Sequence, residues 1–433
     1  MLIPLLAHRL ARPRILAIAF GVVLGSSFSI GAPVRIWLSS HRDKLYYEQM
    51  AARYVSEVDA TFAIEAQAFG HREMPDKLAI ALRTGIQPPD IVQLDEVFFG
   101  AYLQKEVPFL DLTERIQRAG LEQLIVPQRL DLFAYKDRRY AVPQSLSAVV
   151  LYYRRDLFQA HGIDPAELDT WENFIRVGRR LAENGQGFLA LDPSYFEILL
   201  RQRGGHLFDA AGRLLPDFAL AVDTLQWLTE LARSGVAVLP DRSTIFDPMF
   251  FSSDIANGEV MTVLGGDWYG LDMIQQFAPE LAGQWGILPL PVWSDAAKPI
   301  RTSSFAGEGL LIYRGSEQIE ASWRFIEWVM KDPQANAARF LQGNSFPAYK
   351  PSFRDPRLLQ PKPFFGGDRL GLILVGLAPD VPRVVMNPRR TQAVFWIRET
   401  LLNQALYGEA GPEVVLAEFV RQLDREPTHR VAP

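Results

Sequence analysis

The sequence GGDWYG, residues 265–270, places an indole and a carboxylate among three glycines. It follows an apolar run, residues 260–264, that predicts a strand, so the motif lies at a strand end. Glycines let a backbone approach a ligand closely, Trp268 offers a flat apolar face, and Asp267 offers a hydrogen-bond acceptor. These groups suit a sugar, which has an apolar C–H face and an edge of hydroxyl groups. Trp268 also fits a core position, because large aromatic side chains are mostly buried, and Asp267 also fits a turn cap.

The rest of the sequence lacks the side chains or spacings that most catalytic and metal sites need. It contains no Cys, which excludes thiolate nucleophiles, disulfides and cysteine–zinc sites. Its six His stand at positions 8, 41, 71, 161, 206 and 429, and no two have metal-ligand spacing. No GxSxG, HExxH, GxxxxGK[ST] or dinucleotide-binding glycine motif is present. We therefore expect a protein that is not an enzyme and that uses no cofactor or metal.

Length and charge narrow the class of protein further. The chain has 433 residues, of which 48% are hydrophobic and 22% charged, as in globular proteins that form more than one core. Its formal net charge is -5, from 45 basic and 50 acidic side chains. A nucleic-acid-binding protein would carry a basic excess, so we expect no nucleic-acid partner.

The first 32 residues have the layout of a secretory signal peptide, with a basic start, an apolar middle and small residues at the end. Arg9, Arg12 and Arg14 precede an uncharged stretch over residues 15–32. An uncleaved anchor is the alternative, since about 18 apolar residues barely span a bilayer. The early break at residues 25–27 favours cleavage, which predicts a bacterial periplasmic location.

Strands and helices are expected to alternate after this start. They are a strand at 34–40, a helix around Leu45, Met50 and Tyr54, a strand at 61–69, a helix at 76–83 that ends at Gly85, and a strand at 91–94. This order is typical of an open parallel α/β sheet, in which ligands bind beyond the carboxyl ends of the strands. Ser40, His41 and Asp95 stand at those ends, although His41 fits a solvated loop better.

The later chain contains more helices than strands. We expect strands at about 148–153, 260–264 and 309–313, and helices that start at Thr170, Asp217, Ser316, Thr391 and Gly411. Thr170 and Asp217 are expected to cap their helices, because short oxygen-bearing side chains accept hydrogen bonds from free amides.

Four segments resemble the extracellular solute-binding proteins of ABC importers, in the group that includes maltose- and other carbohydrate-binding receptors. They are VRIWLSS after the secretory start, PPDIVQLDEVFFGAYLQ, RRYAVPQSLSAVVLYYRRDLFQAHGIDPAELDTWENF and GEGLLIYRGSEQIEASWRFIEWVMKDPQA. The third is the most specific, since its strand, tyrosines, basic pair and Thr-Trp-Glu-Asn-Phe recur in that order. Together the segments extend over nearly the whole chain after residue 33.

The resemblance implies a two-lobed α/β periplasmic-binding-protein fold of type II, whose discontinuous lobes are joined by a hinge. Lobe 1 would comprise residues 33–144 and 306–352, and lobe 2 residues 145–305 and 353–433, with crossings near Ser145, Phe305 and Ser352. It also implies a monomer in which a ligand binds between the lobes, the lobes close, and a membrane permease recognises the closed form.

The same resemblance implies a set of ligand-binding positions with hydroxyl, carboxylate, amide or aromatic groups near the strand ends and crossings. They are Ser40, His41, Asp95, Gln144, Ser145, Tyr195, Asp267, Trp268, Gly307, Glu308 and Trp396. Trp396 fits a helix core equally well. Arg389 and Arg390 suit an anionic ligand group or, as we favour, a solvated surface.

Three functions remain open at this point. The first is capture of a mono- to oligosaccharide or polyol for an ABC importer. The second keeps the same two-lobed clamp but binds a sugar phosphate or glycerophosphodiester. The third, a secreted carbohydrate-active enzyme, is less favoured because no acidic residue has a recognisable catalytic context.

Overall fold

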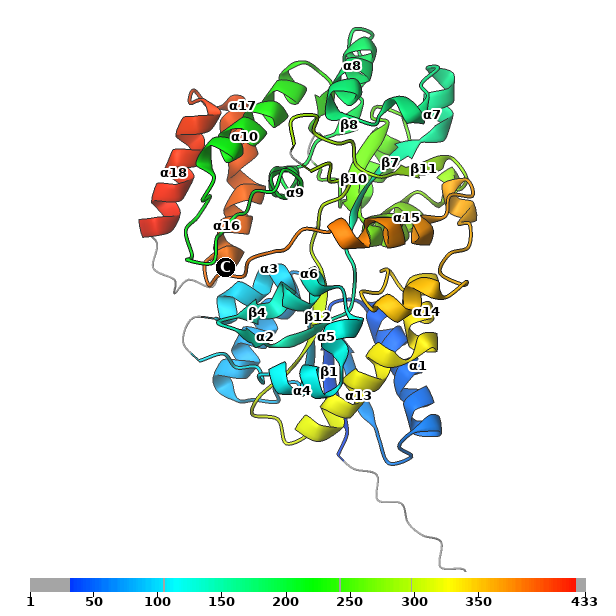
Figure 1. Ribbon diagram of the computed structural model, residues 1–433, viewed down its shortest axis with the longest axis vertical. Helices are drawn as coiled ribbons and strands as arrows, with labels where there is room; N and C mark the ends of the chain where they lie inside the picture. Colours follow the sequence, from blue (N-terminus) through cyan, green and yellow to red (C-terminus); the bar gives the residue numbers. More distant parts are fainter. Residues whose placement is uncertain (1–31, 104–105, 241–242, 297, 426–433) are drawn as a thin grey trace, which may run out of the picture.

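The computed structural model describes residues 32–103, 106–240, 243–296 and 298–425, so almost all of the expected signal peptide lies outside the described residues. Two five-stranded sheets, each covered by helices, form two lobes that lie one above the other in Figure 1. The predicted α/β fold with two discontinuous lobes is confirmed. Within the described ranges, no helix is both long and apolar enough to cross a membrane.

Lobe 1 is built on a sheet with the strand order β2-β1-β3-β12-β6. Its strands are β1 (Val34–Leu38), β2 (Ile64–Ala68), β3 (Ile91–Asp95), β6 (Ala141–Pro143) and β12 (Glu308–Ile312). The first three are parallel, as the alternating pattern predicts, whereas β12 runs antiparallel to β3. Glu308 therefore lies opposite Asp95 at the edge where β3 ends.

Helices pack on both faces of this sheet. They include α1 (His41–Glu57), α2 (Glu73–Thr84), α3 (Glu96–Phe99), α6 (Pro127–Leu130), α13 (Ile319–Lys331) and α14 (Pro333–Leu341). In α1, Tyr47, Met50 and Tyr54 are buried at helical spacing. Leu45, an apolar residue of the expected helix, is 55% exposed, whereas Tyr46 and Tyr47 are buried.

Lobe 2 is built on a sheet with the strand order β11-β7-β10-β8-β9. Its strands are β7 (Val149–Arg154), β8 (Leu189–Ala190), β9 (Ala237–Val238), β10 (Thr262–Gly266) and β11 (Trp285–Leu288). Its main helices are α8 (Trp171–Ala182), α9 (Tyr195–Gln202), α10 (Phe218–Arg233), α15 (Leu370–Leu377), α16 (Arg390–Trp396), α17 (Leu402–Tyr407) and α18 (Pro412–Arg425). The caps are as predicted, with Thr170 accepting from Asn173 N at 3.2 Å and Asp217 from Leu220 N at 3.1 Å.

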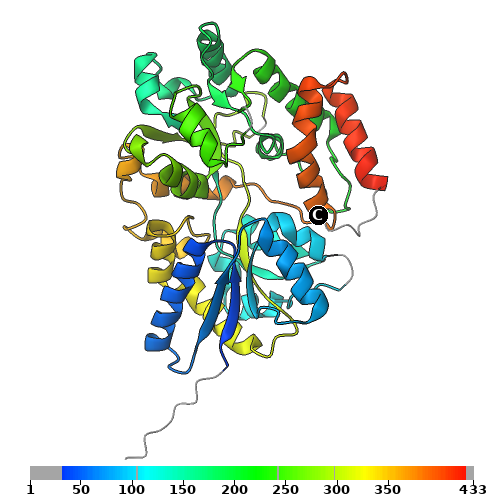
Figure 2. The same ribbon diagram turned by 180° about the vertical axis from the view of Figure 1, so that it is seen from behind.

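Three segments lie side by side at the junction of the lobes, and we call them the crossing segments; the first two run from one lobe to the other. They are residues 144–148, 303–307 and 345–348. The first lies between the other two: Leu146 N donates to Phe346 O at 2.8 Å, and Phe305 N donates to Ser147 O at 3.1 Å. The third pairs with the first through Pro347 and then returns to lobe 1, where Tyr349 pairs with Ile125. The chain contacts the lobe 2 sheet again after Ser352, where Gly283 N donates to Phe364 O at 2.8 Å. The back view in Figure 2 shows the chain passing between the lobes at this level.

Replacing Thr170 by Ala removes the oxygen that accepts from the Asn173 amide. We expect the free energy of unfolding to fall by about 1 kcal/mol, measured by urea denaturation. Thr170→Ser keeps the oxygen and serves as the control; an equal loss for both variants would contradict the capping role.

Candidate functional site

Polar side chains gather where the strands of lobe 1 end, and we call them the edge cluster. Its members are Ser39, Ser40, Asp43, Gln93, Asp95 and Glu308. Gln93 is fully buried at the centre: its Nε2 donates to Gln144 Oε1 at 3.0 Å and to Glu308 Oε2 at 2.5 Å. Its Oε1 accepts from Ser39 N at 3.2 Å. These bonds orient the half-buried Glu308 carboxylate at the sheet edge.

Asp95 ends β3 and caps α3, because its Oδ1 accepts from Val97 N at 2.9 Å. Its Oδ2 lies 3.3 Å from His71 Nε2. Burial raises the pKa of Asp95, but the hydrogen bond and charge of His71, the Val97 amide and the Arg398 guanidinium outweigh it and hold the pKa below its ordinary value. Asp95 is therefore an ionised acceptor.

Ser40 and Asp43 cover the start of α1. Ser40 Oγ accepts from Asp43 N at 3.0 Å and donates to Asp43 Oδ2 at 2.5 Å. The pKa of Glu308 lies well above its ordinary value, because burial and then the nearby Asp43 and Asp95 carboxylates disfavour its charge. The edge cluster thus combines hydroxyl groups, an ionised carboxylate and a carboxyl group that favours its protonated form.

Lobe 2 presents an aromatic patch of Trp268, Phe305 and Phe246. The Trp268 ring lies 6.2 Å from Phe246, at an interplanar angle of 20°, and 5.6 Å from Phe305. Trp268 Nε1 donates to Phe305 O at 3.1 Å, which fixes the half-buried indole. A side chain at Gly266 would meet this ring, since a Cβ there would lie 2.6 Å from Trp268 Nε1. The Arg398 guanidinium lies 5.8 Å from the Phe305 ring.

The segments that follow β1 and β10 contact each other at the boundary between the lobes. Arg42, two residues after Ser40, donates from Nη1 to Leu271 O at 3.3 Å and lies 3.1 Å from Asp272. Leu271 follows Trp268 by three residues. The edge cluster of lobe 1 and the aromatic patch of lobe 2 therefore flank the same boundary.

Four other predicted residues hold the crossing segments instead of standing at an exposed edge. Gln144, Ser145 and Asp267 are buried, and Gly307 adopts φ +134°. Asp267 accepts from Phe346 N at 2.5 Å, and burial raises its pKa to about 7. The Asp267 carboxyl thus links the end of β10 to the third crossing segment, and the backbone amides of Trp268 and Asp267 also lower its pKa, as in the predicted turn cap.

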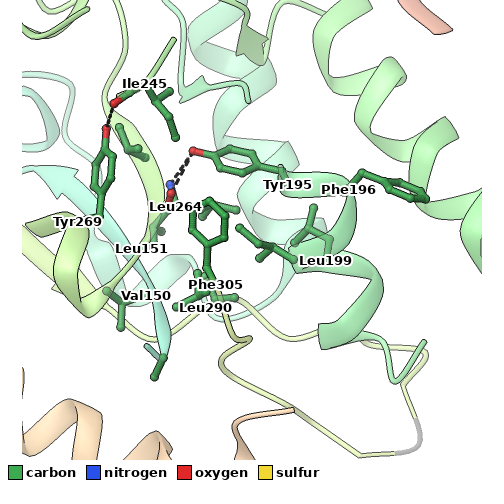
Figure 3. Close-up of a cluster of buried hydrophobic side chains, with 14 of the residues drawn as sticks. Val150, Leu151, Tyr195, Phe196, Leu199, Ile245, Leu264, Tyr269, Leu290 and Phe305 are labelled. Atoms are coloured by element: carbon green, nitrogen blue, oxygen red, sulfur yellow. Dashed lines mark hydrogen bonds between the residues drawn. The ribbon is translucent and has the colours of Figure 1, made fainter. Parts of the chain in front are cut away.

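Two predicted aromatic residues pack within lobe 2, Tyr195 fully buried and Trp396 partly buried. Tyr195 is fully buried in lobe 2, where its hydroxyl donates to Leu264 O at 3.2 Å and accepts from Leu264 N at 2.9 Å (Figure 3). Trp396 stacks on Phe419 with ring centroids 4.5 Å apart, joining α16 to α18. We therefore leave both residues out of the candidate site.

His41 is exposed at the first position of α1. His71 is the histidine that contacts Asp95, and nothing in its sequence surroundings distinguished it. Arg398 and Gln93 were also missed, because a helical arginine and a strand glutamine have no local signature. In the described ranges, no group of three or more His, Cys, Asp or Glu residues is arranged to hold a metal ion.

Arg390 is the centre of a buried ion network rather than part of a solvated surface. Its side chain is 1% exposed; Nε and Nη2 donate to Glu96 at 2.7 and 2.8 Å, and Nη1 donates to Glu197 at 2.6 Å. Arg201 adds a 2.5 Å bond to the same Glu197 oxygen. Because Glu96 starts α3 in lobe 1 and Glu197 lies on α9 in lobe 2, this network joins the lobes.

The chain belongs to the family of bacterial extracellular solute-binding proteins, whose model matches residues 41–336. Members of this family are binding proteins that act outside the bacterial cytoplasm, so the chain is a binding protein rather than an enzyme.

Individual relatives are distant in sequence. The chain is 22% identical over 320 residues to the arabinooligosaccharide-binding protein of Halalkalibacterium halodurans, covering 72% of this chain and 71% of the relative. Identity to the Bacillus subtilis arabinooligosaccharide-binding protein is 22% over 306 residues, or 69% of each chain. A Thermotoga lettingae ABC-transporter solute-binding protein bound with α-D-tagatose superposes with a TM-score of 0.74 at 19% identity, covering 91% of this chain and 99% of that one, which supports the fold.

Arg390→Met would leave the Glu96 and Glu197 carboxylates buried without their shared cation. We expect the free energy of unfolding to fall by about 3 kcal/mol or more, measured by urea denaturation. The neighbouring Arg389 pairs with Asp424, which is 57% exposed, so Arg389→Met should cost less than about 1 kcal/mol. Similar losses for the two variants would contradict the network.

Asp267 should make stability depend on pH. Its folded pKa of about 7 lies above the ordinary value of 3.8, so across this window the folded protein keeps a proton that the unfolded chain has released. Stability therefore falls as the pH rises from the lower value to the upper one. Asp267→Asn removes this contribution, and urea titrations in mildly acidic and mildly alkaline buffer should show the variant gaining on the wild type as the pH rises. A difference independent of pH would contradict the assignment.

Proposed function

We propose that the protein captures a carbohydrate, a mono- to oligosaccharide or polyol, between its lobes and delivers it to the permease of an ABC transporter. The observation that carries the proposal is the pairing of the edge cluster on lobe 1 with the aromatic patch on lobe 2 at one boundary. The names of the relatives support it, since two of them bind arabino-oligosaccharides and one structure holds tagatose.

Each surface suits a different part of a sugar. Asp95 can accept hydrogen bonds from hydroxyl groups, and Ser40 and Glu308 can donate or accept them. The half-buried Trp268 face can cover the apolar C–H groups. A ligand that contacts both surfaces favours the arrangement in which the lobes are together, and differential contacts of this kind are what drive closure.

The two lobes would divide the chain at the crossing segments, with residues 33–144 and 306–352 in lobe 1 and residues 145–305 and 353–433 in lobe 2. The sheets support this division at the first two crossings, because β6 and β7, and likewise β11 and β12, belong to different sheets. We further propose a monomer that reaches the periplasm through a cleaved signal peptide over residues 1–32.

A neutral sugar fits better than a sugar phosphate. The edge cluster holds the carboxyl groups of Asp43, Asp95 and Glu308 close enough to raise the pKa of Glu308, and an anion placed there would be repelled. Arg42 and Arg398 lie nearby, but Arg42 is paired with Asp272 and Arg398 favours the ionised form of Asp95.

Calorimetric titration with arabino-oligosaccharides, tagatose, other sugars and polyols, and sugar phosphates tests the proposal. Trp268→Ala should weaken binding of the best ligand by about 2 kcal/mol or more, because buried aromatic anchors contribute most to affinity. Trp396→Ala is the matched control, since Trp396 packs on α18: it should lower thermal stability and leave affinity unchanged.

The outcomes separate the alternatives. Equal affinity losses for the two tryptophan variants would remove Trp268 from the site. Binding that weakens steeply with added salt would favour the sugar phosphate, and no binding to any compound in the set would reject the carbohydrate proposal.

A further inference from the structure

Two residues of the crossing segments have backbone conformations that disfavour side chains. Ser147 has φ +50° and Ala306 has φ +59°, and they stand in the first and second crossing segments. In this left-handed region a Cβ crowds the following carbonyl group, a cost that glycine does not incur. Gly307, with φ +134°, follows Ala306 directly. Both segments that carry the chain between β6 and β7 and between β11 and β12 thus contain a non-glycine residue in the left-handed region.

A buried arginine holds these two segments in place. Arg129, on α6 of lobe 1, is 1% exposed. Its Nε donates to Ser145 O at 3.0 Å and its Nη2 donates to Ala306 O at 3.1 Å. The guanidinium lies directly against Gly307, where a Cβ would be 1.7 Å from Nη2. The Arg129 side chain therefore donates hydrogen bonds to the backbone of both segments that contain left-handed residues.

Charged groups of lobe 2 complete the arrangement. Arg201 donates to Ser304 O at 2.6 Å, and Asp267 holds the third crossing segment through Phe346 N. Asp267 N also donates to Ala148 O at 3.1 Å in the first segment. Each crossing segment is thus fixed by at least one buried charged residue, so the left-handed conformations are imposed by the surroundings rather than by local sequence.

We propose that Ser147 and Ala306 form a strained hinge, held by Arg129, that opposes the arrangement of the lobes described here and thereby lowers ligand affinity. When two lobes move apart, the residues of the crossing segments absorb the change in φ and ψ. A left-handed alanine gains free energy by moving to negative φ, so opening releases strain that ligand contacts must otherwise offset. The inference rests on the proposed function, because it concerns the clamp that binds the ligand.

Ala306→Gly tests the proposal, since it removes one methyl group and the cost of the left-handed conformation. We expect the dissociation constant of the best ligand to fall on the order of fivefold. The control is Gln87→Gly: Gln87 has φ +47° in an exposed loop of lobe 1, away from the crossings. The Gln87→Gly substitution relieves comparable backbone strain and should leave the affinity for the ligand unchanged.

A second measurement needs no ligand. The chain has no Cys, so dyes can be attached specifically to Ile80→Cys on α2 and Tyr407→Cys at the end of α17, positions that are 54% and 75% exposed on different lobes. Single-molecule energy transfer then reports the fraction of molecules with the lobes together. Ala306→Gly should raise this fraction, and Gln87→Gly should not.

Arg129→Lys provides a change in the opposite direction. A lysine keeps the charge but lacks the planar fork that reaches two carbonyl oxygens at once, so the fraction with the lobes together should fall and affinity should weaken. The strained hinge would be overturned if Ala306→Gly changed neither the affinity nor the fraction of molecules with the lobes together. It would also be overturned if Arg129→Lys had the affinity and the fraction of the wild type. If no sugar binds, the proposed function fails while the energy-transfer result still decides the hinge.

Discussion

Backbone hydrogen bonding among the three crossing segments is the constraint on which the rest of the structure depends. Residues 144–148 lie between the other two segments and bond to both. The lobe 1 sheet combines strands from before the first crossing and after the second, and lobe 2 adds helices from the end of the chain, α15 to α18, to its own sheet, so neither lobe is an independent stretch of chain. The buried charges of Arg129, Arg201 and Asp267 all attach to this junction. These side chains stabilise the junction through hydrogen bonds to its backbone groups.

The two faces beside this junction differ in chemistry because they arise from different strand ends. On lobe 1, the antiparallel return of β12 brings Glu308 next to Asp95, and the buried Gln93 orients it. On lobe 2, β10 ends in glycines that let Trp268 lie against its own strand. Lobe 1 thus presents a mostly polar face and lobe 2 a mostly apolar face. A sugar, which has hydroxyl groups on one side and C–H groups on another, needs both.

Local features of the chain were predictable from sequence, and long-range contacts were not. The caps at Thr170 and Asp217 follow from local chemistry, and the parallel start of lobe 1 follows from alternating patterns. The burial of Tyr195 and Trp396 depends on which helix face meets a neighbour, so residue type alone could not separate core from ligand contact. Arg390 illustrates the same limit, since both of its carboxylate partners are distant in the chain. The glycine at 307 has a structural cause, the Arg129 guanidinium, that no motif encodes.

The position of β12 has a consequence for how the chain acquires its structure. This strand lies between β3 and β6, so the sheet that begins at Val34 stays split until residues near Ile312 have been made. Contacts of such long sequence separation form slowly. Lobe 1 can therefore complete its sheet only after every strand of lobe 2 has been synthesised.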